Sequence, residues 1–132
     1  MITLRLIGYW NGEQASGWPD VAAFVDAGWD EDERHMVGRY LASGTVARIF
    51  MGFSVCRICG ASNGSVEYSE GTYIWPSGLA HYVDQHDVRL PDEFVRHAAA
   101  RLRELDAAGF DDQWWMGRQG PLGISPWTGR GL

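Results

Sequence analysis

Four residues of types that bind metal ions fall into two short clusters of this sequence. The first cluster is Cys56-Arg57-Ile58-Cys59, which holds both cysteines of the chain, and the second is His81-Tyr82-Val83-Asp84-Gln85-His86. Together they give the pattern C-x2-C, a 21-residue spacer and H-x4-H. Two thiolates and two imidazoles are ligands that tetrahedral zinc prefers. The sequence therefore predicts a zinc site formed by Cys56, Cys59, His81 and His86.

The spacing within each pair is compatible with binding a single ion. Two cysteines three residues apart can both turn inward on a tight knuckle, and Gly60 supplies the conformational freedom that the bend requires. The histidines are expected on a short helix over residues 77–86, with Ser77 as its N-cap. Positions i and i+5 lie about 140° apart on an ideal helix. The two imidazoles can therefore converge only if the last turn loosens around residues 84–86.

A β-hairpin is expected between the two ligand pairs. Residues 66–69 and 72–75 flank Glu70-Gly71, a two-residue loop with glycine where a positive φ is needed. The register of this loop predicts two cross-strand pairs on one face, Val66 with Trp75 and Tyr68 with Tyr73. The knuckle, the hairpin and the histidine helix then form a zinc-finger-like ββα unit.

The four ligand residues resemble the ligand set of a Cys2His2 zinc finger or of a treble-clef relative. The similarity covers residues 53–91, and the 21-residue spacer is longer than the roughly 12 residues of DNA-binding fingers. The resemblance therefore implies the four ligands and no base-reading residues. The wider stretch from Cys56 to Pro91 also resembles a recurrent bacterial protein family that has no assigned activity.

Other interpretations of these residues stay open. C-x-x-C is also a redox motif, although glycine and a turn follow Cys59 here, where thioredoxin-like motifs open a helix. The H-x4-H pair can also be two ordinary surface histidines. Four protein ligands close the tetrahedral shell, which favours a structural zinc site. The alternative is a zinc-dependent enzyme in which His86 is not bound and leaves a coordination position open.

Nothing in the rest of the sequence identifies a catalytic residue. The sequence contains no G-x-S-x-G, P-loop, G-x-G-x-x-G or H-E-x-x-H motif. His35 and His97 each follow a glutamate four residues earlier, Glu31 and Glu93, which is the spacing of ordinary helix pairs. We therefore predict neither a catalytic residue nor an organic cofactor.

Composition and charge narrow the class of partner. The 132-residue chain is 45% hydrophobic and carries a net charge of −6, and all of its 11 basic residues are arginines. Arginines can recognise phosphate or carboxylate groups, but codon usage also produces such a bias, and these arginines are scattered. Nucleic acid is not the expected partner, because a nucleic-acid binder needs a basic stripe.

The expected location is the cytoplasm. No apolar run approaches 18 residues, and the first residues show no secretory-signal pattern, so we expect no membrane span and no signal peptide. Two cysteines spaced for a metal ion also fit a reducing compartment better than a disulfide framework does.

The periodicity of the chain predicts an α+β fold in a small single domain over residues 1–132, with the ββα unit packed against N- and C-terminal helices. Its first segment, residues 1–52, reads as strand, helix, helix and strand, with strands over 1–7 and 45–55. The second of these helices begins with a capping box of Asp30 and Glu33. The zinc-finger-like unit spans 53–91, and a helix spans 92–109. The apolar face of that last helix comprises Phe94, Val95, Ala98, Leu102 and Leu105.

The tail over residues 110–132 shows neither helical nor strand periodicity. It is rich in glycine and contains Trp114, Trp115 and Trp127. These tryptophans either pack against the domain surface or form an interaction arm, since tryptophan is a frequent anchor of binding hot spots. A protein partner bound through Trp114, Trp115 and Trp127 is the partner we predict.

Overall fold

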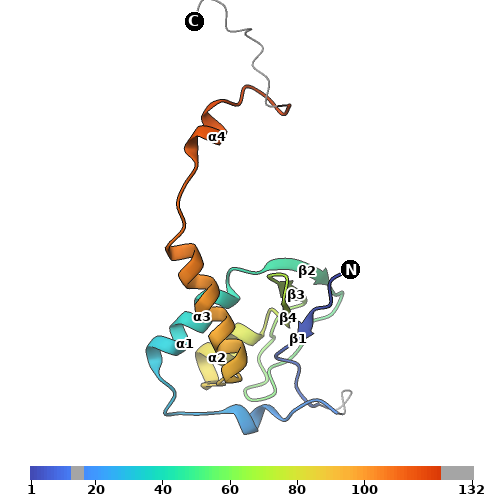
Figure 1. Cartoon of the computed structure of the whole chain (residues 1–132). Helices are drawn as coiled ribbons and strands as arrows, with labels where there is room; N and C mark the ends of the chain where they lie inside the picture. Colours follow the sequence, from blue (N-terminus) through green and yellow to red (C-terminus); the bar gives the residue numbers. More distant parts are fainter. Residues whose placement is uncertain (13–16, 123–132) are drawn as a thin grey trace, which may run out of the picture. The chain divides into compact units, whose positions relative to one another are not determined.

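The computed structural model describes residues 1–12 and 17–122, and its contacts divide the chain into two units, Met1–Leu102 and Arg103–Leu132. The first unit mixes strands and helices, which confirms the predicted α+β class. Its four-stranded sheet has the order β1-β4-β3-β2 (Figure 1). The strands are β1 (Arg5–Leu6), β2 (Thr45–Ile49), β3 (Val66–Ser69) and β4 (Tyr73–Pro76). β1 runs parallel to β4, and the other neighbours are antiparallel.

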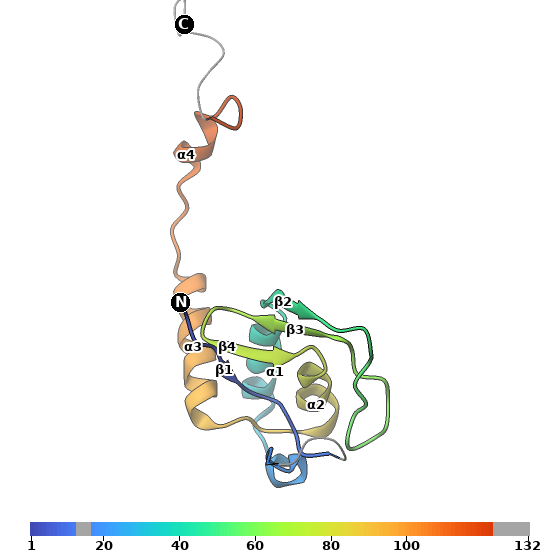
Figure 2. The same cartoon turned by 90° about the vertical axis from the view of Figure 1, so that its right-hand side faces the viewer.

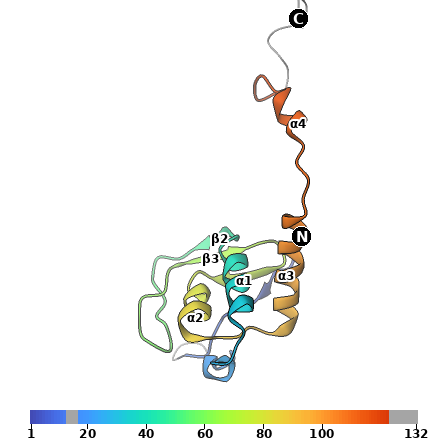
Figure 3. The same cartoon turned by 90° about the vertical axis from the view of Figure 1, so that its left-hand side faces the viewer.

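The α-helices of this unit lie on one face of the sheet. They are α1 (Glu31–Leu41), α2 (Leu79–His86) and α3 (Asp92–Asp106), and a 3-10 helix, η1 (Val21–Phe24), precedes them in the chain. α1 and α2 lie behind the sheet in Figure 2 and in front of it in Figure 3. The core between the layers is aromatic, with ring centroids 5.6 Å apart for Tyr40 and Trp75 and 4.9 Å apart for Tyr73 and Phe94. Such edge-on and tilted pairs add to the burial of apolar area.

Helix α1 begins as the sequence predicts. The side chain of Asp30 accepts a hydrogen bond of 2.9 Å from the backbone N–H of Glu33, which satisfies one of the free donors of the first turn. The buried face of the helix consists of Val37, Tyr40 and Leu41.

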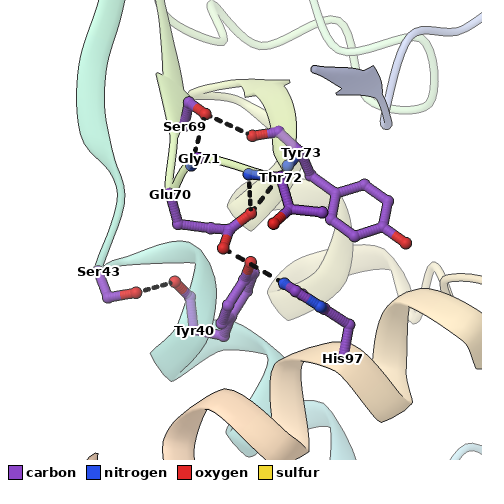
Figure 4. Close-up of polar contacts among 8 residues, drawn as sticks. All are labelled: Tyr40, Ser43, Ser69, Glu70, Gly71, Thr72, Tyr73 and His97. Atoms are coloured by element: carbon purple, nitrogen blue, oxygen red, sulfur yellow. Dashed lines mark hydrogen bonds and ion pairs between the residues drawn. The ribbon is translucent and has the colours of Figure 1, made fainter. Parts of the chain in front are cut away.

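The predicted hairpin exists, but its register is wrong by two residues. The observed pairs are Glu67 with Pro76, Tyr68 with Trp75 and Ser69 with Ile74. Side chains of the loop explain the shift (Figure 4). The Glu70 carboxylate accepts the N–H groups of Thr72 and Tyr73, both at 2.8 Å, and the Ser69 hydroxyl donates to the Tyr73 carbonyl. These bonds stabilise a longer loop, and the two-residue shift keeps every side chain on its predicted face.

The other strands are shorter than predicted. Only residues 5–6 of the predicted strand 1–7 and residues 45–49 of the predicted strand 45–55 form ladders. A register irregularity between Val46 and Arg48 bends β2. The chain after Ile49 continues as a loop that is joined to residues 61–65 by an isolated bridge of Val55 with Ser62 and by separate backbone hydrogen bonds, such as Phe50 N–H to the Ser65 carbonyl.

Two helix boundaries also differ from the predictions. Ser77 is not the N-cap of α2, because its backbone N–H still bonds to the carbonyl of Val66 at the end of the sheet, and the cap position falls on Gly78. Helix α3 ends at Asp106 rather than at residue 109. Its buried face holds four of the predicted residues, whereas Leu105 is exposed.

The second unit contains a helix where the sequence predicts none. Helix α4 spans Asp112–Met116, and the side chain of Asp111 caps it by accepting the N–H of Trp114. The Trp114 and Trp115 rings stack with centroids 6.3 Å apart, and the Arg118 guanidinium lies over Trp114. Trp127 lies outside the described residues. Within the described ranges, no helix combines the length and apolarity that a membrane span requires.

Candidate metal centre

Both cysteines lie on a tight backbone knuckle. The N–H of Cys56 donates to the carbonyl of Ala61 at 2.8 Å, and the N–H of Gly60 donates back to the carbonyl of Cys56 at 2.9 Å. Gly60 has a φ of 76°, a left-handed conformation that side chains disfavour. The glycine after the second cysteine therefore has the role that the sequence predicts.

The two thiols differ in their surroundings. Cys56 is buried, and Cys59 is exposed. Burial raises the pKa of the Cys56 thiol, but the backbone N–H groups of Cys59 and Ile58, together with the side chains of Cys59 and Tyr82, outweigh this effect, so the net pKa lies below its ordinary value. The N–H of Cys59 lies 3.5 Å from the sulfur of Cys56. Backbone donors aimed at the sulfur favour the thiolate, which is the form that binds metal ions.

The end of helix α2 brings the two histidines together. Asp87 follows the helix in a left-handed conformation, with φ of 52°, and its N–H reaches the carbonyl of Tyr82, five residues earlier. This wide last turn is the loosening that the H-x4-H spacing requires. The ring centroids of His81 and His86 lie 5.0 Å apart.

The candidate ligand atoms of Cys56, Cys59, His81 and His86 all lie within 4.8 Å of one another. The sulfur of Cys59 is 3.4 Å from Nε2 of His81. Zinc bonds of the usual length place ligand atoms of a tetrahedral shell about 3.3–3.8 Å apart, so small side-chain movements suffice to surround an ion. Nε2 of His86 is buried and has no hydrogen-bond partner among the residues that the structure describes. Metal coordination would satisfy this atom.

Tyr82 is a further residue of the centre that sequence reasoning missed. It is buried between the two histidines of α2, and its phenol oxygen accepts the backbone N–H of Arg57 at 2.7 Å. This bond ties the helix to the knuckle. The contact joins residues 25 positions apart in the sequence. The only signal for Tyr82 in the sequence is its position between the two predicted histidine ligands.

The remaining histidines lie away from this centre. His35 lies 3.8 Å from Glu31 as predicted, which is an exposed helix pair. The predicted pair of His97 with Glu93 is wrong. Nε2 of His97 lies 3.3 Å from the Glu70 carboxylate (Figure 4), while Glu93 pairs with Arg5. Glu70, in the hairpin loop, therefore pairs with His97 of α3 in place of Glu93. The spacing of residues along one helix cannot reveal such a tertiary contact.

Comparison with known proteins gives no match to a family model, to a curated protein or to a solved structure. The four clustered residues form a Cys2His2 group that could bind a metal ion.

Proposed function

We propose that this chain is a small zinc-binding protein whose Cys2His2 site is structural, and that it serves as a protein-interaction or regulatory module. The observation that supports the site best is the convergence of four ligand atoms within 4.8 Å. Its zinc-finger-like or treble-clef-like ligand set, its kinship with a bacterial family of unassigned activity and its cytoplasmic location belong to the same proposal.

The donor set favours zinc over other metals. Two thiolates with two imidazoles suit a tetrahedral, borderline-soft ion, whereas magnesium and calcium prefer oxygen ligands. Four protein ligands also leave no position for a water molecule, which favours a structural role over a hydrolytic one. An open-site enzyme would need His86 outside the shell, but its ring lies among the other ligands.

Metal analysis of the purified full-length chain tests the site. We expect about one zinc per chain, and we expect His86→Ala to lower this content strongly. His35→Ala is the matched control, because His35 is an exposed helix residue paired with Glu31. A chain without metal, or a native disulfide between Cys56 and Cys59, would contradict the proposal and favour the redox alternative.

The aromatic tail supports the interaction role. Trp114 and Trp115 stack on each other, and exposed tryptophans are common anchors of protein interfaces. Affinity capture with the full chain and with a variant lacking residues 111–132, which also removes Trp127, tests this role. Loss of a captured protein with unchanged zinc content and melting temperature supports it. A large loss of stability would assign the tryptophans to the core.

A further inference from the structure

A cavity of about 620 Å³ is lined by the sheet, by the loop that follows β2 and by Gly78 and Tyr82 at α2. The sheet contributes Leu6, Arg48, Glu67 and Pro76, and the loop that follows β2 contributes Phe50 and Phe53. The segment after β1 adds Tyr9 and Trp18. Sites for small molecules fall in this size range and occur as concave, mostly apolar surfaces with few polar groups.

Aromatic side chains dominate the wall of the cavity. Tyr9 and Trp18 form a tilted pair with ring centroids 5.9 Å apart, and both Phe50 and Phe53 are exposed. Side chains of this kind stack on planar or apolar ligands, and leaving them in contact with water is unfavourable. The wall therefore favours a ligand with an apolar body.

A charged pair lies at the floor of the cavity. Arg48 and Glu67 are direct partners in the register of β2 and β3, with Nε 2.7 Å from Oε1 and Nη2 3.0 Å from Oε2. The hydroxyl of Tyr9 donates to the same carboxylate. Glu67 is only 2% exposed, whereas the Arg48 side chain is 58% exposed. The Glu67 carboxylate thus orients the Arg48 guanidinium. Because Glu67 is buried, the Arg48 guanidinium is the member of the pair that a bound ligand can contact.

A second guanidinium makes the cavity positive. Arg57 lines it from the knuckle, where Nη1 donates to the carbonyl of Val55 at 3.1 Å. The guanidinium fits against Gly12, where an added Cβ would lie 2.7 Å from Nε. Among the residues that the structure describes, the charged side chains of the lining are thus two arginines and one glutamate. This local excess of positive charge contrasts with the net charge of −6 of the chain and attracts anions.

We propose that this cavity binds a small organic anion with an aromatic or apolar body and a carboxylate group. The planar guanidinium of Arg48, oriented by Glu67, matches a carboxylate, and the aromatic wall takes the body of the ligand. Ligands that carry several phosphates fit less well, because most of the wall is apolar. None of the four candidate metal ligands lines the cavity, although Arg57 and Tyr82 border both sites. The proposal does not require a particular role for the metal.

NMR titration of the full-length protein, as purified, with trans-cinnamate tests the proposal, with neutral cinnamamide as the matched probe. We expect saturable shifts confined to residues 48–54 and 63–67 and to the Trp18 indole. The amide should bind at least tenfold more weakly. Equal binding of acid and amide would overturn the proposal, as would shifts that map to Trp114 and Trp115 instead.

A double variant, Arg48→Gln with Glu67→Gln, removes both charges, because a change of Arg48 alone would leave a buried unpaired carboxylate. It should weaken cinnamate binding at least tenfold, whereas Arg96→Gln on α3 should not. Unchanged binding in a folded double variant would overturn the role of Arg48. If this variant does not fold, the proposal is tested on the unaltered protein alone, by the ratio of its affinities for cinnamate and cinnamamide and by the residues whose NMR signals shift.

Discussion

The phenol oxygen of Tyr82 lies 2.7 Å from the backbone nitrogen of Arg57 and accepts its N–H. Tyr82 sits between the two histidines of α2, and Arg57 follows the first cysteine of the knuckle. One hydrogen bond therefore joins the two halves of the candidate metal centre. Because such a contact fixes the halves before an ion arrives, it lowers the ordering cost of binding.

The first prediction is that Tyr82→Phe weakens both folding and metal binding. Loss of the acceptor leaves a partly buried N–H without its partner, which costs about 1–3 kcal/mol. We expect a lower melting temperature and a several-fold weaker zinc affinity, measured by competition with a chromophoric chelator. Tyr68→Phe, on β3, is the matched control and should leave zinc affinity unchanged. Equal affinity in Tyr82→Phe and the unaltered protein would show that the knuckle is organised without this bond.

The second prediction is that metal loss loosens the knuckle more than the core. Trp75, Leu79 and Val83 are buried in the hydrophobic core, and the burial of apolar side chains stabilises this core in addition to any metal bonds. Cys59→Ser should therefore accelerate amide hydrogen exchange over residues 54–62 while α1 and α3 stay protected. Global loss of protection would show that the metal stabilises the whole first unit, as in isolated zinc fingers.

The sequence predicts the cluster of four candidate ligands because each pair of candidates is local. Cys56 and Cys59 share one turn, and His81 and His86 share one helix, so residue type and spacing carry the information. Helices α1 and α3 are predicted for a similar reason, since the Asp30 cap and the apolar periodicity both act within a few residues.

The hairpin register and the partner of His97 depend on contacts that spacing does not encode. The Glu70 side chain closes the loop onto its own backbone and then reaches His97, 27 residues away. The parallel pairing of β1 with β4 is also non-local. Side chains in a strand alternate with a period of two, so the sequence pattern predicts which side chains share a face of the strand. It does not predict which strands lie next to each other in the sheet.

The third prediction concerns the close approach of the knuckle loop to the start of α2. A Cβ at Gly78 would lie 2.3 Å from the side chain and 2.5 Å from the carbonyl oxygen of Asn63. Gly78→Ala should therefore destabilise the protein by about 1–3 kcal/mol, as overpacking does. Gly38→Ala in α1 is the control, because nothing lies within 4 Å of its added Cβ. This change should stabilise the helix by about 0.5–1 kcal/mol, measured by urea unfolding.

The last prediction is that Glu70 makes stability depend on pH. Burial raises the pKa of Glu70, but the N–H of Tyr73, the ring of His97 and the N–H of Thr72 outweigh it, so the net pKa lies below its ordinary value near 4.5. A carboxylate whose pKa is lowered by folding stabilises the protein above the unfolded pKa, and this contribution is lost as the pH falls through the folded pKa.

Glu70→Gln should therefore lower the free energy of unfolding by about 1–3 kcal/mol at neutral pH, since hydrogen bonds to a charged group are lost. The difference between variant and unaltered protein should shrink as the pH falls below about 4.5 and through the folded pKa of Glu70, below which both side chains are neutral. Urea unfolding from pH 7 to pH 3 measures this difference. Contributions of titrating groups that do not contact Glu70 cancel in it, whereas the pairing of Glu70 with His97 is part of the measured effect. Glu31→Gln, in an exposed pair, should change stability by less than about 0.5 kcal/mol. A Glu70→Gln effect that is constant with pH would assign the stabilisation to the shape of the loop instead of its charge.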